Sequence, residues 1–357
     1  MKQWLHLAKN PQKLATYKIR EKVIDTIRSH FKSEGFLEVE TPLLCENPGT
    51  EPYLEVFKTT LKAQNHQDRS GYLVTSPELF MKKLLAAGVG SCFQICKSFR
   101  NDEGVSSRHN HEFTILEWYR VDADYTKVMQ DCEELLLAIL RVVTGDESAT
   151  VLEYQGKKYD LSLGWERVTV AEAFEKYAGV TTEDMLSEDA LLRIGKEKGY
   201  SLSNVTDWEE VYNQIFLNEI EPHLGVSKPT IIYDYPASQA ALSKRKKEDP
   251  RFAERFEFYL AGLELGNAFS ELTDHDEQRA RMIEDLELRK QFGKYEYNVD
   301  EDFFAALKMG LPRTGGIAVG VDRLVMLFAN VASVRETLFF PINDIFDFSA
   351  DHSEKVE

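Results

Sequence analysis

The sequence has few cysteines and no long apolar run. No stretch of the 357 residues approaches the ~18 consecutive apolar residues of a membrane-spanning helix. Residues 1–20 lack the apolar core of a secretory signal peptide. Cys45, Cys92, Cys96 and Cys132 are too few for a disulfide framework. We therefore expect a cytoplasmic protein with reduced thiols.

Basic residues are outnumbered by acidic ones. Lys and Arg total 43 against 60 Asp and Glu, which gives a net charge of −17 at pH 7. A field of this sign repels nucleic acid at long range, so we do not expect tRNA binding. The content of 43% hydrophobic and 29% charged residues is typical of a globular chain, with one large domain or one domain carrying an insertion.

The common nucleotide-binding and hydrolase motifs are absent. The sequence contains no GxxxxGK[ST], GxGxxG, HExxH or GxSxG. Any phosphate site must therefore use another arrangement. Ser76 has no histidine near it in sequence, so a serine nucleophile has little support.

The hydrophobic pattern predicts strands that adjoin as hairpins, with helices between them. Helices are predicted at residues 16–35, 78–88, 128–143 and 276–293, and strands at 35–42, 71–75, 92–97, 113–121, 230–236, 255–262 and 263–269, while residues 315–329 form a glycine-rich strand that runs into a helix. This order favours an α+β fold with an antiparallel sheet. We interpret residues 1–340 as one domain with a helical insertion at about 165–225, followed by a polar tail at 341–357.

The hairpin "SFRNDEGVSSRHNHEF", residues 98–113, is unusually charged. Arg100 and Arg108 could clamp phosphates, and Phe113 could stack on a base. The alternative is a solvated surface loop, which can have the same charged residues without binding a phosphate or a base.

A zinc site is the rival interpretation of this hairpin. Cys92, Cys96, His109 and His111 form a Cys₂His₂ set. On a strand, however, the C-x₃-C spacing separates the sulfurs by more than ~13 Å. We therefore favour two small core cysteines.

Two further segments carry charge inside apolar strands. Glu257 and Glu264 in "RFEFYLAGLELGNAF" are costly to bury unless they are paired or bind a cation, and together they could hold Mg²⁺; the alternative is the wet face of an edge hairpin. In "GGIAVGVDR" the glycines allow close approach of a ring, and Arg323 could meet a phosphate at the helix start. The alternative there is a packing strand with Asp322 as the N-cap.

These pieces match one family in order. "GFLEVETPLL" resembles motif 1 of the class II aminoacyl-tRNA synthetases, "SFRNDEG" to "RHNHEF" resembles motif 2, and "GIAVGVDRL" resembles motif 3. "ELGNAFSEL" is close to the signature of the lysine branch. The resemblance covers residues 15–340 and implies a catalytic domain that uses ATP and Mg²⁺ and forms a homodimer through motif 1.

Within the lysine branch, the chain resembles the elongation factor P (R)-β-lysine ligases, which are truncated relatives of lysyl-tRNA synthetase. Ser76 in "TSPEL", "YPASQAAL" and Ala318 support this, and the first helix begins too early for an N-terminal anticodon domain. "RHN" with Arg108 and "LGN" with Gly266 are closer to lysyl-tRNA synthetases. The implied reaction is ATP-dependent activation of (R)-β-lysine, or lysine, and transfer to a lysine of elongation factor P.

The resemblance also implies roles for individual residues. In the ATP site these are Arg100, Asp102 or Glu103, Arg108, His109, Asn110, Phe113, Glu264, Leu265, Gly320 and Arg323, with Arg100, Glu264 and Arg323 catalytic and Glu257 and Glu264 binding Mg²⁺. In the amino-acid site they are Ser76, Glu78, Tyr119, Asn267, Glu271 and Ala318: Glu78 near the first amino group, Asn267 at the carboxylate, and Glu271 with Tyr119 at the far ammonium. The motif 2 loop is one residue longer than usual, so either Asp102 or Glu103 could fill the acidic position that reads adenine.

Three alternatives remain open. A minimal lysyl-tRNA synthetase would share the pocket but need a tRNA surface. A small-molecule amide ligase of this fold, such as an asparagine synthetase, would want a cationic pocket, against which Glu271 counts. A non-catalytic regulatory paralogue would be expected to lose its phosphate-binding arginines, yet Arg100 and Arg323 are both present.

Overall fold

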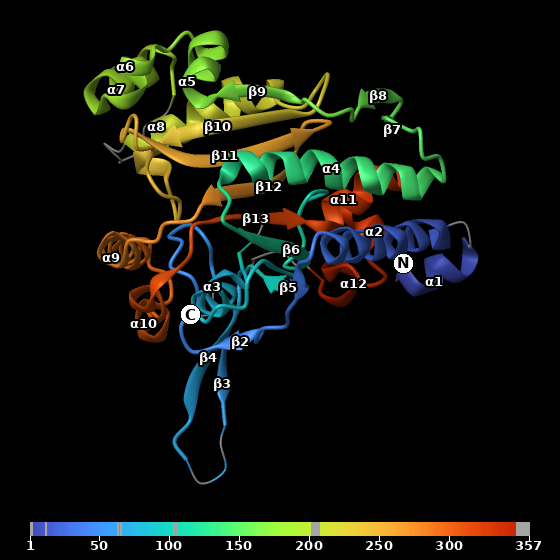
Figure 1. Cartoon of the computed structure of the whole chain (residues 1–357), viewed down its shortest axis with the longest axis horizontal. Helices are drawn as coiled ribbons and strands as arrows, with labels where there is room; N and C mark the ends of the chain where they lie inside the picture. Colours follow the sequence, from blue (N-terminus) through green and yellow to red (C-terminus); the bar gives the residue numbers. More distant parts are fainter. Residues whose placement is uncertain are drawn as a thin grey trace, which may run out of the picture.

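An eight-stranded sheet forms the centre of the protein. The computed structural model describes residues 3–10, 13–62, 64, 66–102, 104, 106–200 and 208–347. The sheet order is β1-β5-β6-β13-β12-β11-β10-β9 (Figure 1). Its strands are β1 (Leu37–Glu38), β5 (Cys92–Phe99), β6 (Glu112–Val121), β9 (Glu166–Thr169), β10 (Thr230–Pro236), β11 (Phe252–Leu260), β12 (Leu263–Ser270) and β13 (Thr314–Gly320). Neighbours from β5 to β10 pair antiparallel, which confirms the predicted α+β fold, and only the outermost pairs β1–β5 and β9–β10 are parallel.

One face of the sheet is covered by helices. These are α2 (Leu14–Ser33), α4 (Tyr125–Thr144) and α11 (Val321–Phe328) (Figure 1). Ile27 and Phe31 of α2 pack with Leu116 and Trp118 of β6 in the main core. The predicted helices at 16–35 and 128–143 are therefore confirmed, because their apolar stripes face the apolar side of the sheet.

The strand predicted at residues 35–42 is wrong in length. Gly35, with φ of +80°, ends α2 in the left-handed region that favours glycine, and the chain enters β1 at once. Only Leu37 and Glu38 pair with β5. The chain then leaves the sheet, and Pro42 has no N–H with which to extend the ladder.

The described residues 165–200 and 208–225 form a mostly helical layer at the far edge of the sheet, shown at the top of Figure 1. Its elements are β9, α5 (Val170–Ala173), η2 (Phe174–Ala178), α6 (Thr182–Leu186), α7 (Glu188–Glu197), α8 (Trp208–Ile215), η3 (Phe216–Ile220) and η4 (Glu221–His223). They share a separate apolar cluster with β10 and β11. Its division from the rest as an insertion stays an interpretation.

The remaining elements lie around the central sheet and its covering helices (Figure 1). The helices are α1 (Gln3–Lys9), α3 (Glu78–Ala86), α9 (His275–Gln291), α10 (Glu301–Gly310), α12 (Ile342–Ile345), η5 (Ala237–Gln239) and η6 (Val334–Thr337), and the strands are β2 (Leu44–Cys45), β3 (Lys58–Leu61), β4 (Arg69–Leu73), β7 (Val151–Tyr154) and β8 (Lys157–Asp160). The β3–β4 hairpin projects away from the body of the molecule (Figure 1).

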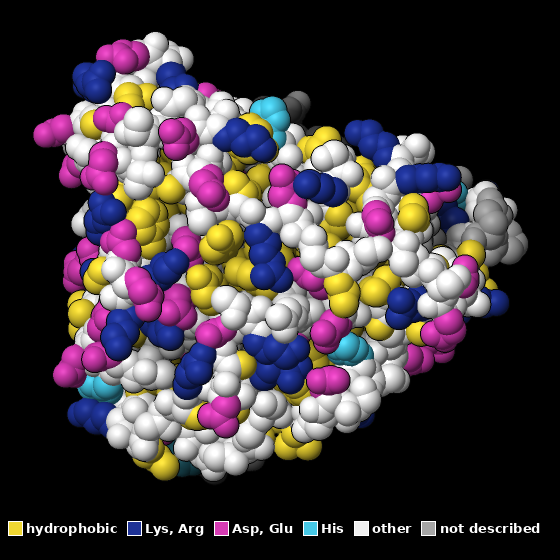
Figure 2. All heavy atoms as spheres, turned by 45° about the horizontal axis from the view of Figure 1, so that its top comes forward, with side chains coloured by type: hydrophobic (Ala, Val, Ile, Leu, Met, Phe, Trp, Pro, Cys, Tyr) yellow, Lys and Arg dark blue, Asp and Glu magenta, His cyan; other side chains and the backbone are white. Residues whose placement is uncertain are grey.

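The surface carries charge of both signs. On the face drawn in Figure 2, acidic and basic side chains are interspersed with small hydrophobic patches. Across the described ranges, no helix is both long and apolar enough to cross a membrane.

Candidate active site

A cavity of about 480 Å³ lies on the face of the sheet opposite α2 and α4. Strand alternation creates it: Leu116 and Trp118 of β6 face the helices, while Glu117 and Tyr119 face the cavity. The predicted site residues that line it are Ser76, Glu78, Arg100, Arg108, His109, Asn110, Phe113, Tyr119, Glu257, Glu264, Leu265, Asn267, Glu271, Ala318, Gly320 and Arg323. Residues far apart in the sequence therefore meet in one place.

Asp102 does not belong to this set. Its side chain is exposed and outside the cavity wall, and its backbone has φ of +57° in the loop after β5. The prediction that Asp102 fills the acidic position is not supported by this arrangement, because the side chain lies in solvent. The other candidate, Glu103, lies outside the described residues.

One row of paired residues forms the floor of the cavity. Glu117 of β6 pairs with Ala318 of β13, which pairs with Asn267 of β12, which pairs with Glu257 of β11. Directly paired residues place their side chains on the same face of the sheet. The Ala318 methyl group therefore lies between an acid and an amide.

A β-bulge aims Glu264 at the same face. The β11–β12 register shifts at Phe258 and Tyr259, so that Gly266 pairs with Phe258 but Glu264 pairs with Tyr259. Between these two pairs, β12 has one residue more than β11. Without that extra residue, strict alternation along β12 would put Glu264 and Asn267 on opposite faces of the sheet. The bulge thus brings two polar side chains of one strand into one cavity. Since β11 and β12 are inner strands, the edge-hairpin alternative for Glu257 and Glu264 is wrong.

Asn267 has a fixed amide orientation. The Arg255 Nε donates to Asn267 Oδ1 at 3.0 Å, while Arg255 Nη2 donates to Glu257 Oε1 at 2.7 Å. The amide oxygen of Asn267 is therefore occupied, and its Nδ2 group remains as a donor. A donor at this position suits a carboxylate ligand.

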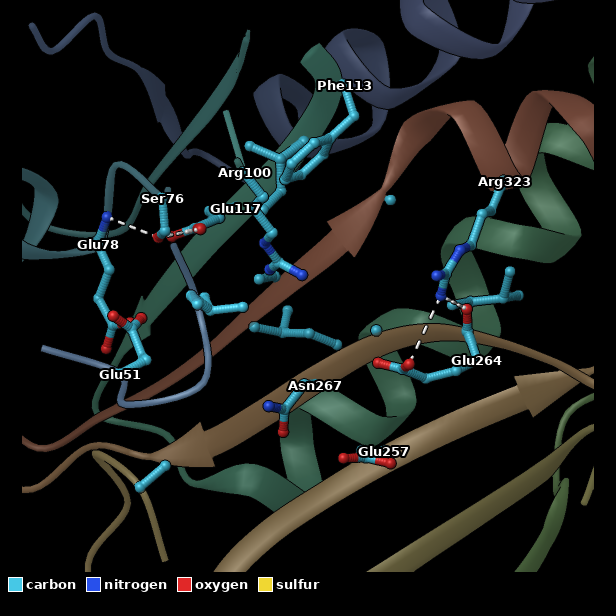
Figure 3. Close-up of a pocket in the computed structure, with 18 of the residues that line it drawn as sticks. Glu51, Ser76, Glu78, Arg100, Phe113, Glu117, Glu257, Glu264, Asn267 and Arg323 are labelled. Atoms are coloured by element: carbon cyan, nitrogen blue, oxygen red, sulfur yellow. Dashed lines mark hydrogen bonds and ion pairs between the residues drawn. The ribbon is translucent and has the colours of Figure 1, made fainter. Parts of the chain in front are cut away.

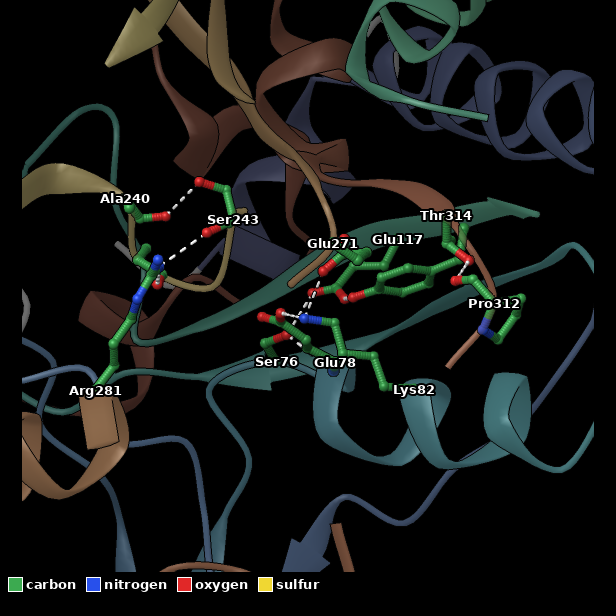
Figure 4. Close-up of polar contacts among 12 residues, drawn as sticks. Ser76, Glu78, Lys82, Glu117, Ala240, Ser243, Glu271, Arg281, Pro312 and Thr314 are labelled. Carbon is green, nitrogen blue, oxygen red and sulfur yellow. Dashed lines mark hydrogen bonds and ion pairs between the residues drawn. The ribbon is translucent and has the colours of Figure 1, made fainter. Parts of the chain in front are cut away.

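At one end of the cavity, acids surround a buried lysine of the chain itself. The Lys82 Nζ lies 2.5 Å from Glu78 Oε1 and 2.5 Å from Glu271 Oε2 (Figure 4). The Lys82 and Glu271 side chains are each 1% exposed. The two carboxylates raise the pKa of Lys82 although burial opposes this, so the lysine stays charged.

Glu117 is the third acid of this end, and a pKa of about 8 keeps its carboxyl group mostly protonated at pH 7. It accepts a hydrogen bond from Ser76 Oγ at 2.5 Å and from Tyr119 Oη at 3.1 Å. Burial, helped by the charge of Glu78, raises the pKa of Glu117 to about 8. Burial also raises the pKa of Glu271 to about 7, against the attraction of Lys82. Because the pKa values of Glu117 and Glu271 are near neutrality, a cation bound here would shift both carboxyl groups to the ionised form.

Gly316 makes room for this acidic end. A Cβ atom at Gly316 would lie 2.2 Å from Glu271 Oε1 and 2.5 Å from the Tyr119 ring. Glycine is therefore required by close approach at this position, as the sequence predicted for the glycine-rich strand.

The opposite end of the cavity is basic. Arg323 Nη1 donates to the Glu264 carbonyl at 2.6 Å and lies 3.5 Å from Glu264 Oε2, while Nη2 contacts His109 Nε2 at 3.0 Å. The Arg100 guanidinium lies over the Phe113 ring, 5.1 Å from its centroid. Figure 3 shows Arg323 and Glu264 at one end, Ser76, Glu78 and Glu117 at the other, and Arg100 reaching between them.

Two predicted residues have structural contacts instead of free polar groups. Asp322 accepts from Arg20 Nη1 at 2.6 Å and from the Thr114 backbone at 2.8 Å, so it ties α2 to β6 and does not cap a helix. Asn110 donates to the Glu112 carbonyl at 2.6 Å and accepts from the Ile342 backbone at 3.0 Å, which anchors the end of motif 2.

The acids Glu257 and Glu264 fit a divalent cation held together with phosphate oxygens. Both line the same cavity, and burial together with the nearby Glu264 charge raises the pKa of Glu257. Arg255 and the Tyr259 hydroxyl each bond one oxygen of Glu257. Two carboxylates leave coordination positions for other oxygens, as magnesium sites do.

The zinc alternative is wrong for the residues that the structure describes. No group of three or more His, Cys, Asp or Glu among them could hold a metal ion. Cys92 is buried in an apolar cluster, and burial raises the pKa of Cys92 and of Cys96 to about 12. Cys92 is therefore a core residue, while Cys96 is half-buried.

The sequence predictions missed Lys82, Glu117 and Arg255, although a local signal existed for each of them. Lys82 stands four residues after Glu78 on a helix, the spacing of an ion pair. Glu117 stands two residues before Tyr119 on a strand and so shares its face. Arg255 stands two residues before Glu257 on one strand, so it shares the face of Glu257 and pairs with it.

The chain belongs to the class II aminoacyl-tRNA synthetases. The model of the family of "tRNA synthetases class II (D, K and N)" matches residues 1–344. Among curated relatives, the chain is 40% identical over 342 residues to an elongation factor P–(R)-β-lysine ligase of Avibacterium paragallinarum, covering 95% of this chain and 99% of that protein. It is 37% identical over 341 residues to a lysine–tRNA ligase of Pelotomaculum thermopropionicum, covering 95% of this chain but 65% of that protein. The chain thus spans about two thirds of the length of such lysine–tRNA ligases.

Proposed function

We propose that this protein activates (R)-β-lysine, or lysine, with ATP and transfers the aminoacyl group to a lysine side chain of translation elongation factor P. The observation that carries the proposal is the two-ended cavity, with Glu78, Glu117 and Glu271 at one end and arginines at the other. The likeness to the Avibacterium ligase along nearly its full length supports the same acceptor.

The acidic end selects the amino acid. Glu78, Glu117 and Glu271 carry up to three negative charges, and Lys82 neutralises one of them. The remaining two match the two ammonium groups of lysine or β-lysine. An analogue without these ammonium groups would leave buried carboxylates without a partner, which would weaken its binding. Glu117 here takes the amino group nearer the carboxylate, a role first predicted for Glu78.

The basic end positions the nucleotide. Arg100 bridges the substrate carboxylate and the α-phosphate, Arg108 and Arg323 hold the outer phosphates, and Phe113 stacks on adenine. The carboxylate oxygen attacks the α-phosphorus, and pyrophosphate leaves. No general base is needed, because the nucleophile is already ionised, so positioning and charge stabilisation supply the catalysis. Magnesium bound by Glu257 and Glu264 would add positive charge at the phosphates.

Ala318 tunes the amino-acid site. It lies between Glu117 and Asn267, which take the amino and carboxylate ends of the substrate in this proposal. A methyl group there changes the distance at which an α- or β-amino group fits, an effect of ~1–3 kcal/mol.

The test is ATP–pyrophosphate exchange with L-lysine, (R)-β-lysine and aspartate in parallel, followed by transfer to elongation factor P or to lysine tRNA. Strongest exchange with (R)-β-lysine and transfer to the protein acceptor would support the proposal. Exchange with L-lysine and transfer only to tRNA would replace it by the second candidate, a lysine–tRNA ligase, which the Pelotomaculum relative supports. If no amino acid supported exchange, the proposal would be wrong, and the cavity would belong to a protein that binds its ligands without activating them.

We also propose a homodimer through the motif 1 segment. Leu37 and Leu44 of this segment are 54% and 39% exposed, and apolar side chains of a stable interface are expected to look like this in a single chain. Light scattering at micromolar concentration should give twice the mass of 41.0 kDa. A monomer mass would contradict the dimer.

A further inference from the structure

A second cavity of about 990 Å³ opens beside the first. It is lined by the loop at residues 47–53, the segment 237–245, and parts of α3, α8 and α9. The two cavities share wall residues, among them Glu51, Ser76 and Glu78. Their junction is therefore at the acidic end of the active site, beside Glu117, which in the proposed function holds the amino group nearer the activated carboxyl group.

Glu51 stands at this junction with an unsatisfied oxygen. Its Oε2 is buried and has no hydrogen-bond partner in the part of the chain that the structure describes. In Figure 3 the Glu51 side chain lies next to that of Glu78, at the end of the cavity away from Arg323. A buried polar atom without a partner destabilises the folded protein, so its persistence calls for a function.

The loop that carries Glu51 is held firmly. Arg289 Nη1 donates to the carbonyls of Glu51 at 2.9 Å and Leu54 at 2.5 Å. Thr50 Oγ1 donates to Asp285 Oδ2 at 2.9 Å, and Tyr297 donates to the Gly49 carbonyl at 2.7 Å. These contacts fix the backbone from α9 and from the loop after it, so the unpartnered carboxylate oxygen is built into position.

The charges on the wall of the second cavity favour binding of a cationic group. It carries the acids Glu188, Glu209, Glu284 and Asp285 in addition to Glu51 and Glu78. Its arginines are paired with other acids: Arg245 and Arg281 with Glu277, Arg251 with Asp249, and Arg255 with Glu257. Net negative charge thus remains on the wall.

We infer that the second cavity admits the acceptor amine and that Glu51 is the base that removes its proton. This inference rests on the proposed function, because it concerns the second half of that reaction. A lysine side chain is an ammonium at neutral pH and cannot attack until it loses a proton.

The step balances as follows. The acceptor ammonium gives one proton to the Glu51 carboxylate, and the neutral nitrogen attacks the carbonyl carbon of the aminoacyl-adenylate. The new C–N bond forms as the C–O bond to AMP breaks, and the second proton leaves with the phosphate oxygen of AMP. Burial, with the charge of Glu78 adding to it, raises the pKa of Glu51, which makes this carboxylate a stronger base. Arg100 and Arg289 oppose this rise.

The test compares wild type, Glu51→Gln and Glu51→Asp, with Glu46→Gln as the matched control. Glu46 lies in the same part of the chain, but its side chain is 67% exposed. Each full-length protein is assayed for pyrophosphate exchange and for single-turnover transfer to elongation factor P. Hydroxylamine, which is neutral at pH 7, serves as an acceptor that needs no base.

We expect Glu51→Gln to exchange pyrophosphate and react with hydroxylamine like wild type, while transfer to the protein acceptor slows by about 100-fold at pH 7. That transfer should recover as pH rises toward the pKa of the amine, and Glu51→Asp should restore part of it. A merely structural role would not produce this pH profile.

Two results would overturn the inference. Equal loss of exchange and transfer in Glu51→Gln would place Glu51 on the activated amino acid, and wild-type transfer would leave it without a catalytic role. Failure of the proposed function looks different, because then the wild-type protein itself would not exchange pyrophosphate or would not modify elongation factor P.

Discussion

Replacing Glu117 by glutamine tests the electrostatics of the amino-acid site most directly. The pKa of Glu117 is raised to about 8 by burial, so at pH 7 roughly 0.9 of the carboxyls hold a proton in the free protein. An incoming ammonium favours the ionised form and should expel that proton. We therefore expect lysine binding at pH 7 to release roughly one proton from this position.

The size of the affinity change follows from burial. Glu117 is 1% exposed, so a charge pair formed there is fully desolvated. Losing one partner of such a pair costs about 2 kcal/mol or more, which weakens lysine binding by about 30-fold or more. Glutamine keeps the shape and one acceptor oxygen, and the hydroxyl of Ser76 or Tyr119 that faces its NH2 group would accept instead of donate, so the loss reports mainly the charge.

Isothermal titration calorimetry in buffers of different ionisation enthalpy measures both quantities. Glu112→Gln is the control, since Glu112 stands on the same strand with its side chain 51% exposed. Wild-type affinity and unchanged proton release in Glu117→Gln would refute the reasoning.

The same variant should change the pH dependence of stability. The folded state holds the Glu117 proton more tightly than the unfolded chain, so this contribution is complete below pH 4.5 and is lost as pH rises to about 8. The difference between these pKa values corresponds to roughly 4–5 kcal/mol at most. Urea unfolding of Glu117→Gln should show a flatter profile over this range, and an unchanged slope would contradict the shift.

Further substitutions test the other parts of the site. Arg323→Ala should weaken ATP binding by about 10- to 100-fold, measured by calorimetry with the nucleotide alone, and unchanged affinity would remove Arg323 from the phosphate end. Gly316→Ala should abolish lysine-dependent exchange but keep ATP binding, because the new methyl group would clash with Glu271 and Tyr119; full exchange would refute that packing. Lys82→Met should destabilise the fold by about 3–5 kcal/mol in urea unfolding, and more at pH 8 than at pH 5, because the carboxyl groups left without the lysine can take up protons at low pH. Equal losses at both pH values would argue against charge as the cause.

Much of the fold was visible in the sequence because its signals are local. The apolar stripe of α2 and the alternation in β5 and β6 depend only on neighbours in the chain, and both were predicted correctly. β1 was predicted too long, since the length of an edge strand depends on how far its partner accompanies it. Periodicity within one segment carries no information about that partner.

The residues that bear chemistry were also largely readable, because the arginines and acids stand in motifs of fixed order. Only the tertiary structure decided how they are arranged. The bulge opposite Phe258 and Tyr259 turns the Glu264 side chain into the cavity. Strict alternation would have placed it on the other face of the sheet from Asn267. The pKa of Glu117 depends on burial by elements far away in sequence.

The sequence by itself determined the class of fold, the charged hairpin and the identity of the side chains that meet in the cavity. The tertiary structure alone decided that Lys82 is buried between Glu78 and Glu271, and that Glu51 lies where two cavities join. The physical reason is that burial and pairing are long-range properties. Whether a carboxylate is a solvated surface group or a reactive group depends on what the rest of the chain packs around it.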